Sequence, residues 1–208
     1  MKTAPPKMTA TIAVVTIASF VLLTAIGKLQ PAAAVGGFIP ARLSGLPVIG
    51  ALPIWLTPLS ATLLHAGAIH IGFNLLMLFY CGREDEVAIG PAGVIVLYIL
   101  GAYAAAAAQY VVGPHSVVPM IGASGAISAL VGAYSMLYGQ RRPSRYPPEI
   151  ARWLHIAWLA AAWIVVQLLL GLASRTEGMA IATAAHVGGF IAGLILARPL
   201  LLWRYRKA

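Results

Sequence analysis

Residues 89–112 read IGPAGVIVLYILGAYAAAAAQYVV, a stretch that contains no charged side chain. A helix needs roughly 20 mainly apolar residues to cross a bilayer, because each residue rises about 1.5 Å and the hydrocarbon core is about 30 Å thick. The whole chain shares this character, since 61% of its residues are apolar and 9% are charged. A soluble domain has roughly 45–50% and about 25%. The sequence therefore predicts an all-α membrane protein.

Five other segments meet the same requirement, which predicts six transmembrane helices in a single domain covering residues 1–208. The expected spans are residues 8–27, 59–80, 89–112, 119–138, 153–172 and 179–201. The longest loop, residues 30–58, contains five prolines and therefore cannot be one regular helix. Because it is also too apolar for a solvated linker, we expect it to lie in the membrane interface with Trp55 at the headgroups.

The distribution of basic residues predicts the orientation in the membrane. If both termini lie in the cytoplasm, eleven Lys and Arg residues face the cytoplasm and three face the other side. Positive residues accumulate in cytoplasmic loops, so we expect both termini to be cytoplasmic.

The basic residues form short clusters between apolar runs, which argues against nucleic-acid binding. The single cysteine, Cys81, excludes an internal disulfide and a cysteine-based metal site.

The N-terminus leaves one alternative open. Two lysines precede its apolar run, and the three alanines at positions 32–34 resemble the small-residue cleavage site of a signal peptide. The apolar run of about twenty residues is longer than the roughly 7–15 residues usual in signal peptides, which favours a retained first span.

We expect a multi-pass protein of the bacterial inner membrane, with the lipid bilayer as its surroundings.

Polar side chains within a span are costly and often functional, and the informative ones here are His65, His70, Asn74, Ser124 and His186. His65 lies near the mouth of the second span, where we expect it to be a packing contact in a loop. Ser124 lies five residues after Pro119, and His186 lies seven after Met179. Both are then roughly 7–11 Å below the outer interface. His70 and Asn74 are four residues apart, so they share one face of the second span. Each has a structural alternative: small-residue packing for the serine, and interhelical hydrogen bonds for the others.

Small residues surround both Ser124 and His186. Gly122 and Gly125 flank Ser124 and leave its hydroxyl open to a substrate backbone. Gly189 and Gly193 follow His186 on the same helix face. Such stripes let two helices approach closely, so Ser124 and His186 could form a hydrogen bond.

Three motifs, in order, carry a family resemblance. Residues 65–74, HAGAIHIGFN, resemble the HxxxxHxxxN segment of the rhomboid intramembrane proteases. Residues 122–125, GASG, resemble the GxSG motif of that family, and residues 185–193 resemble its AHxxGxxxG motif. Gly82-Arg83 and Glu86 also resemble the family's short loop after the second helix. The resemblance covers roughly residues 55–195.

The resemblance implies a six-transmembrane-helix rhomboid-like bundle and an intramembrane serine endopeptidase. It implies that Ser124 is the nucleophile, that His186 is the base, and that His70 and Asn74 line the oxyanion site. Two departures from the family pattern stand out. Leu56 and Thr57 occupy the positions of a frequent Trp-Arg pair, and Ser128 replaces an aromatic residue one turn after the serine.

The acidic residues favour a Ser-His dyad over a triad. All five are expected in loops, and Glu177 lies nine residues before His186, too far to bond its ring. In a Ser-His-Asp enzyme, disabling the Asp lowers kcat by about 10⁴, so a slow enzyme is expected. We expect no cofactor and no metal, and membrane proteins with a transmembrane helix as substrates. The alternatives are a catalytically inactive rhomboid-like binding or quality-control protein and a small transporter.

Overall fold

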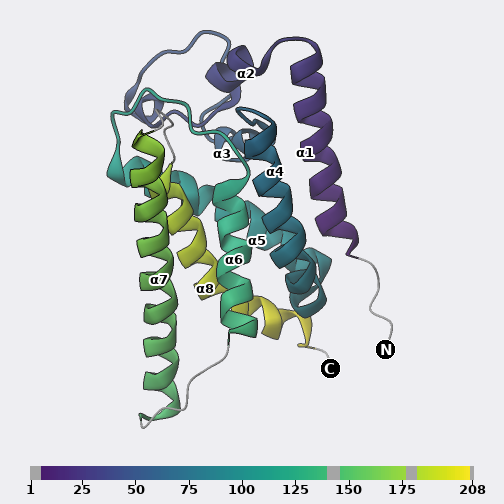
Figure 1. Ribbon diagram of the computed structural model, residues 1–208, viewed down its shortest axis with the longest axis vertical. Coiled ribbons are helices and arrows are strands. Elements are labelled where there is room, and N and C mark those ends of the chain that lie inside the picture. The colour runs from purple at the N-terminus through teal and green to yellow at the C-terminus, as the bar shows by residue number, and fades with distance from the viewer. Residues whose placement is uncertain (1–5, 140–145, 177–181, 207–208) are drawn as a thin grey trace.

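The computed structural model describes residues 6–139, 146–176 and 182–206 (Figure 1). In these residues it contains helices and no β-strand, only an isolated antiparallel bridge between Phe38 and Met120. This confirms the all-α prediction. The elements are α1 Lys7–Ala25, α2 Leu29–Gly36, η1 Pro40–Ser44, α3 Thr57–Ser60, η2 Ala61–Leu63, α4 Ala68–Met77, a π-helical segment Leu78–Gly82 (η3), α5 Arg83–Val112, α6 Ser124–Tyr138, α7 Pro148–Thr176 and α8 Thr183–Arg204.

Three helical stretches in the described residues are long and apolar enough to cross a membrane. They are Lys7–Ala25, Ala68–Val112 and Thr183–Arg204. The 45-residue stretch Ala68–Val112 is far longer than the roughly 20 residues that a single span requires. Its backbone leaves helical geometry at Gly90, where φ is 77°, and Pro91 follows. Residues 68–89 and 91–112 are therefore two helical runs, each close to the length of a span.

The two runs are antiparallel, as their contacts show. We call the end of the bundle at which both chain termini lie the base, and the opposite end the top (Figure 1). At the base, Gly90 lies against the Arg204 side chain near the end of α8. At the top, the His70 ring lies against Gly122, and Ala105 lies against Gly125. The chain therefore descends from His70 to Gly90 and returns to the top along α5.

Glu86 connects α1 to this turn. Its carboxylate accepts hydrogen bonds from the backbone N–H groups of Met8 (2.9 Å) and Thr9 (2.8 Å) and from the Thr9 hydroxyl (2.7 Å). The first N–H groups of a helix lack intrahelical partners, and a carboxylate there also interacts favourably with the helix dipole. Glu86 thus fixes the start of α1 at the base.

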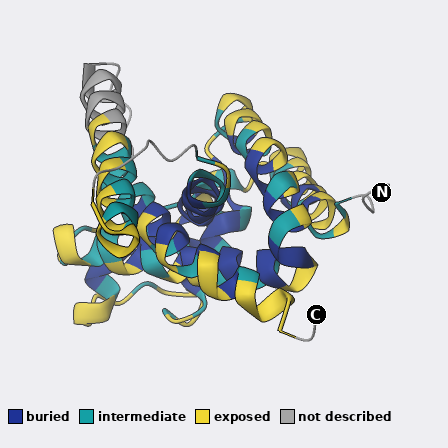
Figure 2. Cartoon of the chain, turned by 90° about the horizontal axis from the view of Figure 1, so that it is seen from below, coloured by how far each residue is buried: buried dark blue, intermediate teal, exposed yellow. Residues whose placement is uncertain are grey.

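The centre of the bundle is α6, whose residues from Gly125 to Ala133 are all buried. Figure 2 shows a buried helix ringed by helices whose outer faces are exposed. The neighbours approach α6 through small residues. A Cβ atom added to Gly132 would collide with the Phe190 carbonyl of α8, and one added to Gly101 of α5 would lie 2.5 Å from Ala129 Cβ. The bundle therefore packs its helices closely about α6.

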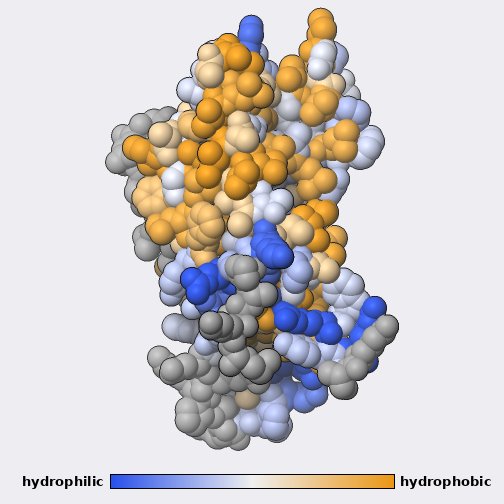
Figure 3. All heavy atoms as spheres, turned by 90° about the vertical axis from the view of Figure 1, so that its right-hand side faces the viewer, coloured by the Kyte–Doolittle hydropathy of each residue, from blue (hydrophilic) through white to orange (hydrophobic). Residues whose placement is uncertain are grey.

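The outer faces are apolar. Phe73, Leu76 and Trp158 are each more than 60% exposed, and a broad hydrophobic band covers the upper part of the face shown in Figure 3, with hydrophilic residues towards the base. Soluble monomers rarely expose contiguous apolar surface on this scale. Such a band is what a lipid-facing surface requires.

Three sequence predictions differ from the structure. The span expected at 59–80 begins as a helix only at Ala68, after α3, η2 and an irregular segment, and it continues past residue 80 to Gly90. The span expected at 119–138 begins as a helix at Ser124, because Met120 pairs with Phe38 in extended conformation. The span expected at 179–201 begins at Thr183 and ends at Arg204, and residues 179–181 lie outside the described residues.

The prediction that all acidic residues lie in loops is wrong. Glu84, Asp85 and Glu86 form the first turn of α5, where Asp85 and Glu86 are buried, and Glu149 lies in the first turn of α7. Glu86 is buried because it caps α1. Glu177 lies outside the described residues. The described acidic residues are therefore helical.

Candidate active site

Ser124 is the first residue of α6, at the top of the bundle. The turn before it is fixed by residues of the second-span region. Gly122 N–H donates to the Ala61 carbonyl (2.9 Å), and Ala123 N–H donates to His65 Nε2 (3.4 Å). Gly122 has a φ of 110°, which L side chains rarely adopt. The serine therefore follows a tight turn whose backbone is held by two hydrogen bonds.

His186 reaches this serine from α8. Its Nε2 atom lies 2.8 Å from Ser124 Oγ, within hydrogen-bonding distance. Two glycines make the approach possible, since a Cβ atom on Gly189 would collide with the Gly125 carbonyl and one on Gly193 with the Ala129 carbonyl. The structure thus brings together a hydroxyl and an imidazole from helices that are distant in sequence.

The His70 ring lies against the same turn. A Cβ atom on Gly122 would lie 2.7 Å from both Cε1 and Nε2 of His70. The Ala66 N–H donates to His70 Nδ1 (3.3 Å), so Nδ1 is an acceptor and a neutral ring carries its proton on Nε2. His70 therefore presents an N–H group beside the turn that precedes Ser124.

Asn74 lies one turn below His70 on α4 and is buried. Its side-chain Nδ2 donates to the His70 carbonyl (2.8 Å), whereas its Oδ1 has no hydrogen-bond partner among the described residues. A side-chain amide has two N–H donors, so one remains after this bond. This bond from Asn74 to the His70 carbonyl lies within α4, so it is not the hydrogen bond between helices that the sequence suggested as a structural alternative.

Comparisons with known proteins agree with this geometry. The family model of the Rhomboid domain matches residues 54–203. The chain belongs to the rhomboid family. Its relatives include rhomboid proteases GlpG of Pectobacterium atrosepticum (33% identity over 141 residues, 66% of this chain and 46% of the relative) and Serratia proteamaculans (34% over 140 residues, 66% and 45%). Another, from Yersinia pestis, is 33% identical over 148 residues, 70% of this chain and 48% of the relative. This rhomboid chain thus spans less than half the length of each of these relatives.

The two departures from the rhomboid pattern have visible local consequences. Ser128 Oγ donates to the Ser124 carbonyl (2.8 Å), one turn back on α6. A Cβ atom added to Gly189 would lie 3.3 Å from the Cβ atom of Ser128, so the small serine side chain lets α8 come close to α6 at this level. Thr57 Oγ1 donates to the Ile54 carbonyl (2.7 Å) and is fully buried, so it closes a turn of the outer loop.

Trp163 also lies at the site of Ser124 and His186, although the sequence did not predict it there. Its indole Nε1 donates to the His186 carbonyl (3.3 Å), and its ring stacks on Phe190 with centroids 4.9 Å apart and planes 11° apart. An aromatic side chain from α7 therefore packs on α8 one turn below His186. The signal available in the sequence is a tryptophan within the fifth expected span, because an indole N–H that is removed from water needs a hydrogen-bond acceptor nearby.

His65 was expected to be a packing contact in a loop, and the structure places it in the irregular segment before α4. Its side chain is 1% exposed, and its ring meets that of His70 edge-on at 5.0 Å. Since His65 Nε2 accepts the Ala123 N–H, this ring supports the turn that precedes Ser124.

Proposed function

We propose that this chain is an intramembrane serine endopeptidase that cleaves transmembrane segments of membrane proteins with a Ser124–His186 dyad. The observation that carries the proposal is the 2.8 Å contact between Ser124 Oγ and His186 Nε2 in a member of the rhomboid family. A nucleophile within hydrogen-bonding reach of a base is the required arrangement for acyl transfer. Relatives of this chain are named as rhomboid proteases, which supports the same chemistry.

The reaction follows from the positions of these two groups. His186 Nε2 takes the proton of Ser124 Oγ as the oxygen attacks a peptide carbonyl carbon. When the tetrahedral intermediate collapses, the C–N bond breaks and the leaving amine takes the proton from His186. A water molecule then gives a proton to His186 and attacks the ester carbonyl carbon. When this second intermediate collapses, the bond between the acyl carbon and Ser124 Oγ breaks, His186 returns the proton to Oγ, and the acid product leaves.

The developing oxyanion needs hydrogen-bond donors beside Ser124. Ser124 is the first residue of α6, so its backbone N–H belongs to the group that a helix leaves without an intrahelical partner. The Nε2–H of His70 adjoins the same turn. We assign both to the oxyanion site, together with the remaining N–H of the Asn74 amide. Donors fixed before the reaction stabilise negative charge without reorganising.

The proposed topology has six spans with both termini in the cytoplasm. Residues 68–89 and 91–112 supply two spans joined at Gly90, and α1, α6, α7 and α8 supply the others. The shared position of both termini at the base supports an even number of crossings (Figure 1). With the base in the cytoplasm, the Ser124–His186 pair lies towards the outer leaflet. A bacterial inner membrane fits this arrangement.

Substrates are proposed to be membrane proteins whose transmembrane helix unwinds locally near the cleavage point. A helix hides its carbonyl groups in hydrogen bonds, and these must open before Ser124 can attack. Helix-breaking residues near the cleaved bond lower that cost. The small residues around Ser124 leave room for an extended backbone.

Fluorophosphonate labelling, combined with cleavage of a panel of tagged single-span proteins, tests the proposal. We expect the wild-type protein to be labelled and to cleave at least one substrate, and Ser124→Ala to do neither. A properly inserted wild-type protein that is neither labelled nor active would favour the inactive rhomboid-like binding protein. Ion or solute flux through reconstituted protein that Ser124→Ala leaves unchanged would favour the transporter.

A further inference from the structure

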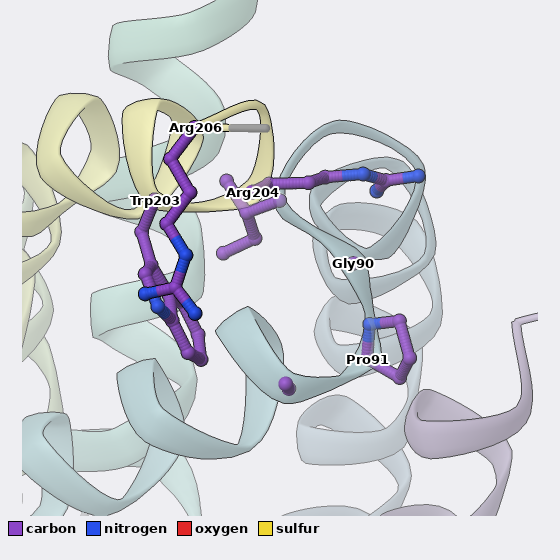
Figure 4. Close-up of a pocket in the computed structure, with 7 residues that line it drawn as sticks. Gly90, Pro91, Trp203, Arg204 and Arg206 are labelled. Carbon is purple, nitrogen blue, oxygen red and sulfur yellow. The ribbon is translucent and has the colours of Figure 1, made fainter. Parts of the chain in front are cut away.

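A pocket of about 400 Å³ lies at the base, far from the Ser124–His186 pair. One wall is the turn of α5, formed by Ile89, Gly90, Pro91 and Ala92, and the other is the end of α8 with Trp203, Arg204 and Arg206 (Figure 4). Nothing in the proposed protease mechanism uses this pocket. Its walls combine two guanidinium groups with apolar surface.

The pocket exists because α5 is broken at Gly90. In a continuous helix the Val87 carbonyl would accept from the N–H of residue 91, but Pro91 has no N–H. Arg204 Nη1 replaces that donor, with bonds to the carbonyls of Val87 (2.6 Å) and Glu86 (2.9 Å). Gly90, whose added Cβ would lie 3.4 Å from this nitrogen, leaves room for the guanidinium.

The charge of Arg204 is not neutralised by these bonds, because carbonyl groups are uncharged. Among the described residues the only salt bridge joins Arg83 to Glu84, at 3.9 Å. The Glu86 carboxylate is engaged at the start of α1, and Asp85 is buried. A guanidinium has five N–H donors, of which the two on Nη1 account for the bonds to α5. Arg204 can therefore still bind an anion.

Arg206 supplies a second positive charge at the same pocket. Its guanidinium carbon lies 5.6 Å from the centroid of the Trp203 ring, and Figure 4 shows the two side chains beside each other. The ring restricts the arginine by a cation–π contact. Tryptophan is also typical of the membrane interface, where one side of the ring is apolar and the other is hydrated.

We propose that this pocket binds the phosphate of an anionic phospholipid from the cytoplasmic leaflet. The arginine side chains fit a phosphate because guanidinium N–H groups donate two parallel bonds to such oxygens. Pro91 and Ala92, both exposed, offer an apolar wall for the glycerol backbone and the start of an acyl chain. The choice of leaflet rests on the topology proposed above, whereas the binding itself does not depend on proteolysis.

Native mass spectrometry of the purified full-length protein tests the proposal. The protein in detergent micelles is titrated with phosphatidylglycerol or with phosphatidylcholine that has the same acyl chains. We expect one phosphatidylglycerol to be retained with at least tenfold higher affinity than phosphatidylcholine. Arg206→Gln should weaken that binding at least tenfold, because it removes a charge-assisted hydrogen bond.

Arg152→Gln is the matched control. Arg152 on α7 also lies over a tryptophan, 5.5 Å from the Trp153 ring centroid, but it does not line the pocket. It should change the affinity less than twofold. If both variants lost the same affinity for phosphatidylglycerol, the binding would depend only on general surface charge, and the proposal would be overturned.

A second variant blocks the pocket and keeps both arginines. Ala92 is exposed and lines the pocket, so Ala92→Phe should fill it and abolish selective retention. Full retention by this variant would refute the site. Glycerol 3-phosphate at millimolar concentration should not compete with the lipid, and competition would instead identify a site for a soluble phosphate. Because the readout is lipid retention, failure of this proposal is distinct from failure of the protease proposal.

Discussion

Gly122→Ala offers the sharpest test of how the serine is positioned. The added Cβ would lie 2.7 Å from Cε1 and Nε2 of His70, whereas ordinary contact begins at 3.4 Å. The ring must therefore retreat by about 0.7 Å (3.4 − 2.7) or the turn must move by the same amount. A displacement of about 1 Å can cost roughly 10²-fold in rate. The φ of 110° adds strain of about 1–2 kcal/mol, on the scale known for left-handed conformations.

We expect Gly122→Ala to lower kcat about 10²-fold with a modest loss of stability. Steady-state cleavage of a single-span substrate and thermal unfolding, measured on the same preparation, give both values. Gly72→Ala is the matched control, because Gly72 is on the same helix as His70 and its Cβ would meet nothing within 4 Å. It should keep full activity and gain about 0.5–1 kcal/mol in stability, as Gly→Ala does in helices.

The cause of the loss can be checked in a His70→Ala background. If the clash with the imidazole is responsible, Gly122→Ala should cost little further activity there, because contacting residues are not additive. An equal loss in both backgrounds would assign the effect to backbone strain alone. Activity of Gly122→Ala above a third of the wild-type value would refute the tight packing of His70 against the turn.

Four further predictions concern the same site. Ser124→Ala and His186→Ala should each leave less than a tenth of the wild-type cleavage rate while the protein still inserts and folds; more activity in either variant would contradict the dyad. Asn74→Ala should lower kcat by up to about 10²–10³ with little change in KM, as expected for an oxyanion donor; a lower melting temperature with kcat within threefold would make Asn74 structural. Trp163→Phe keeps an aromatic ring but loses the indole N–H bonded to the His186 carbonyl, so kcat should fall about two- to tenfold, corresponding to one net hydrogen bond; unchanged kcat would mean that this bond does not position His186. Chelators and added divalent metals should leave the cleavage rate unchanged; loss on chelation that zinc restores would reverse that expectation.

The sequence could predict the helices because their signal is local. Long apolar runs predict the all-helical class. The ordered motifs predict the family, which the match of the Rhomboid domain to residues 54–203 confirms. The depth of Ser124 was estimated from a helix starting at Pro119, but α6 starts at Ser124. The preceding residues bond laterally to Phe38 and Ala61 instead. Such pairings between distant segments leave no periodic signal in the sequence.

Charged residues were misjudged for a related reason. Glu86 resembles a loop residue in sequence, yet it is buried because it caps α1 through Thr9, a residue 77 positions earlier in the chain. Arg204 resembles one more basic residue in a terminal cluster, yet it replaces the N–H that Pro91 lacks. In both cases the partner is an unsatisfied backbone group, and the need for such a partner arises only once the helix ends are known.

These end contacts bear on the catalytic geometry, because α8 carries His186 near its start and Arg204 at its end. The helix is held at the top by the Trp163 bond to the His186 carbonyl, in the middle by the contact of Gly193 with the Ala129 carbonyl, and at the base by Arg204. These three contacts hold α8 against α7, α6 and α5 in turn, from its start to its end. The 2.8 Å distance between His186 Nε2 and Ser124 Oγ then depends on how the whole helix is seated. The proposed Ser124–His186 dyad is therefore positioned by helix packing, because these contacts seat α8 before any substrate binds.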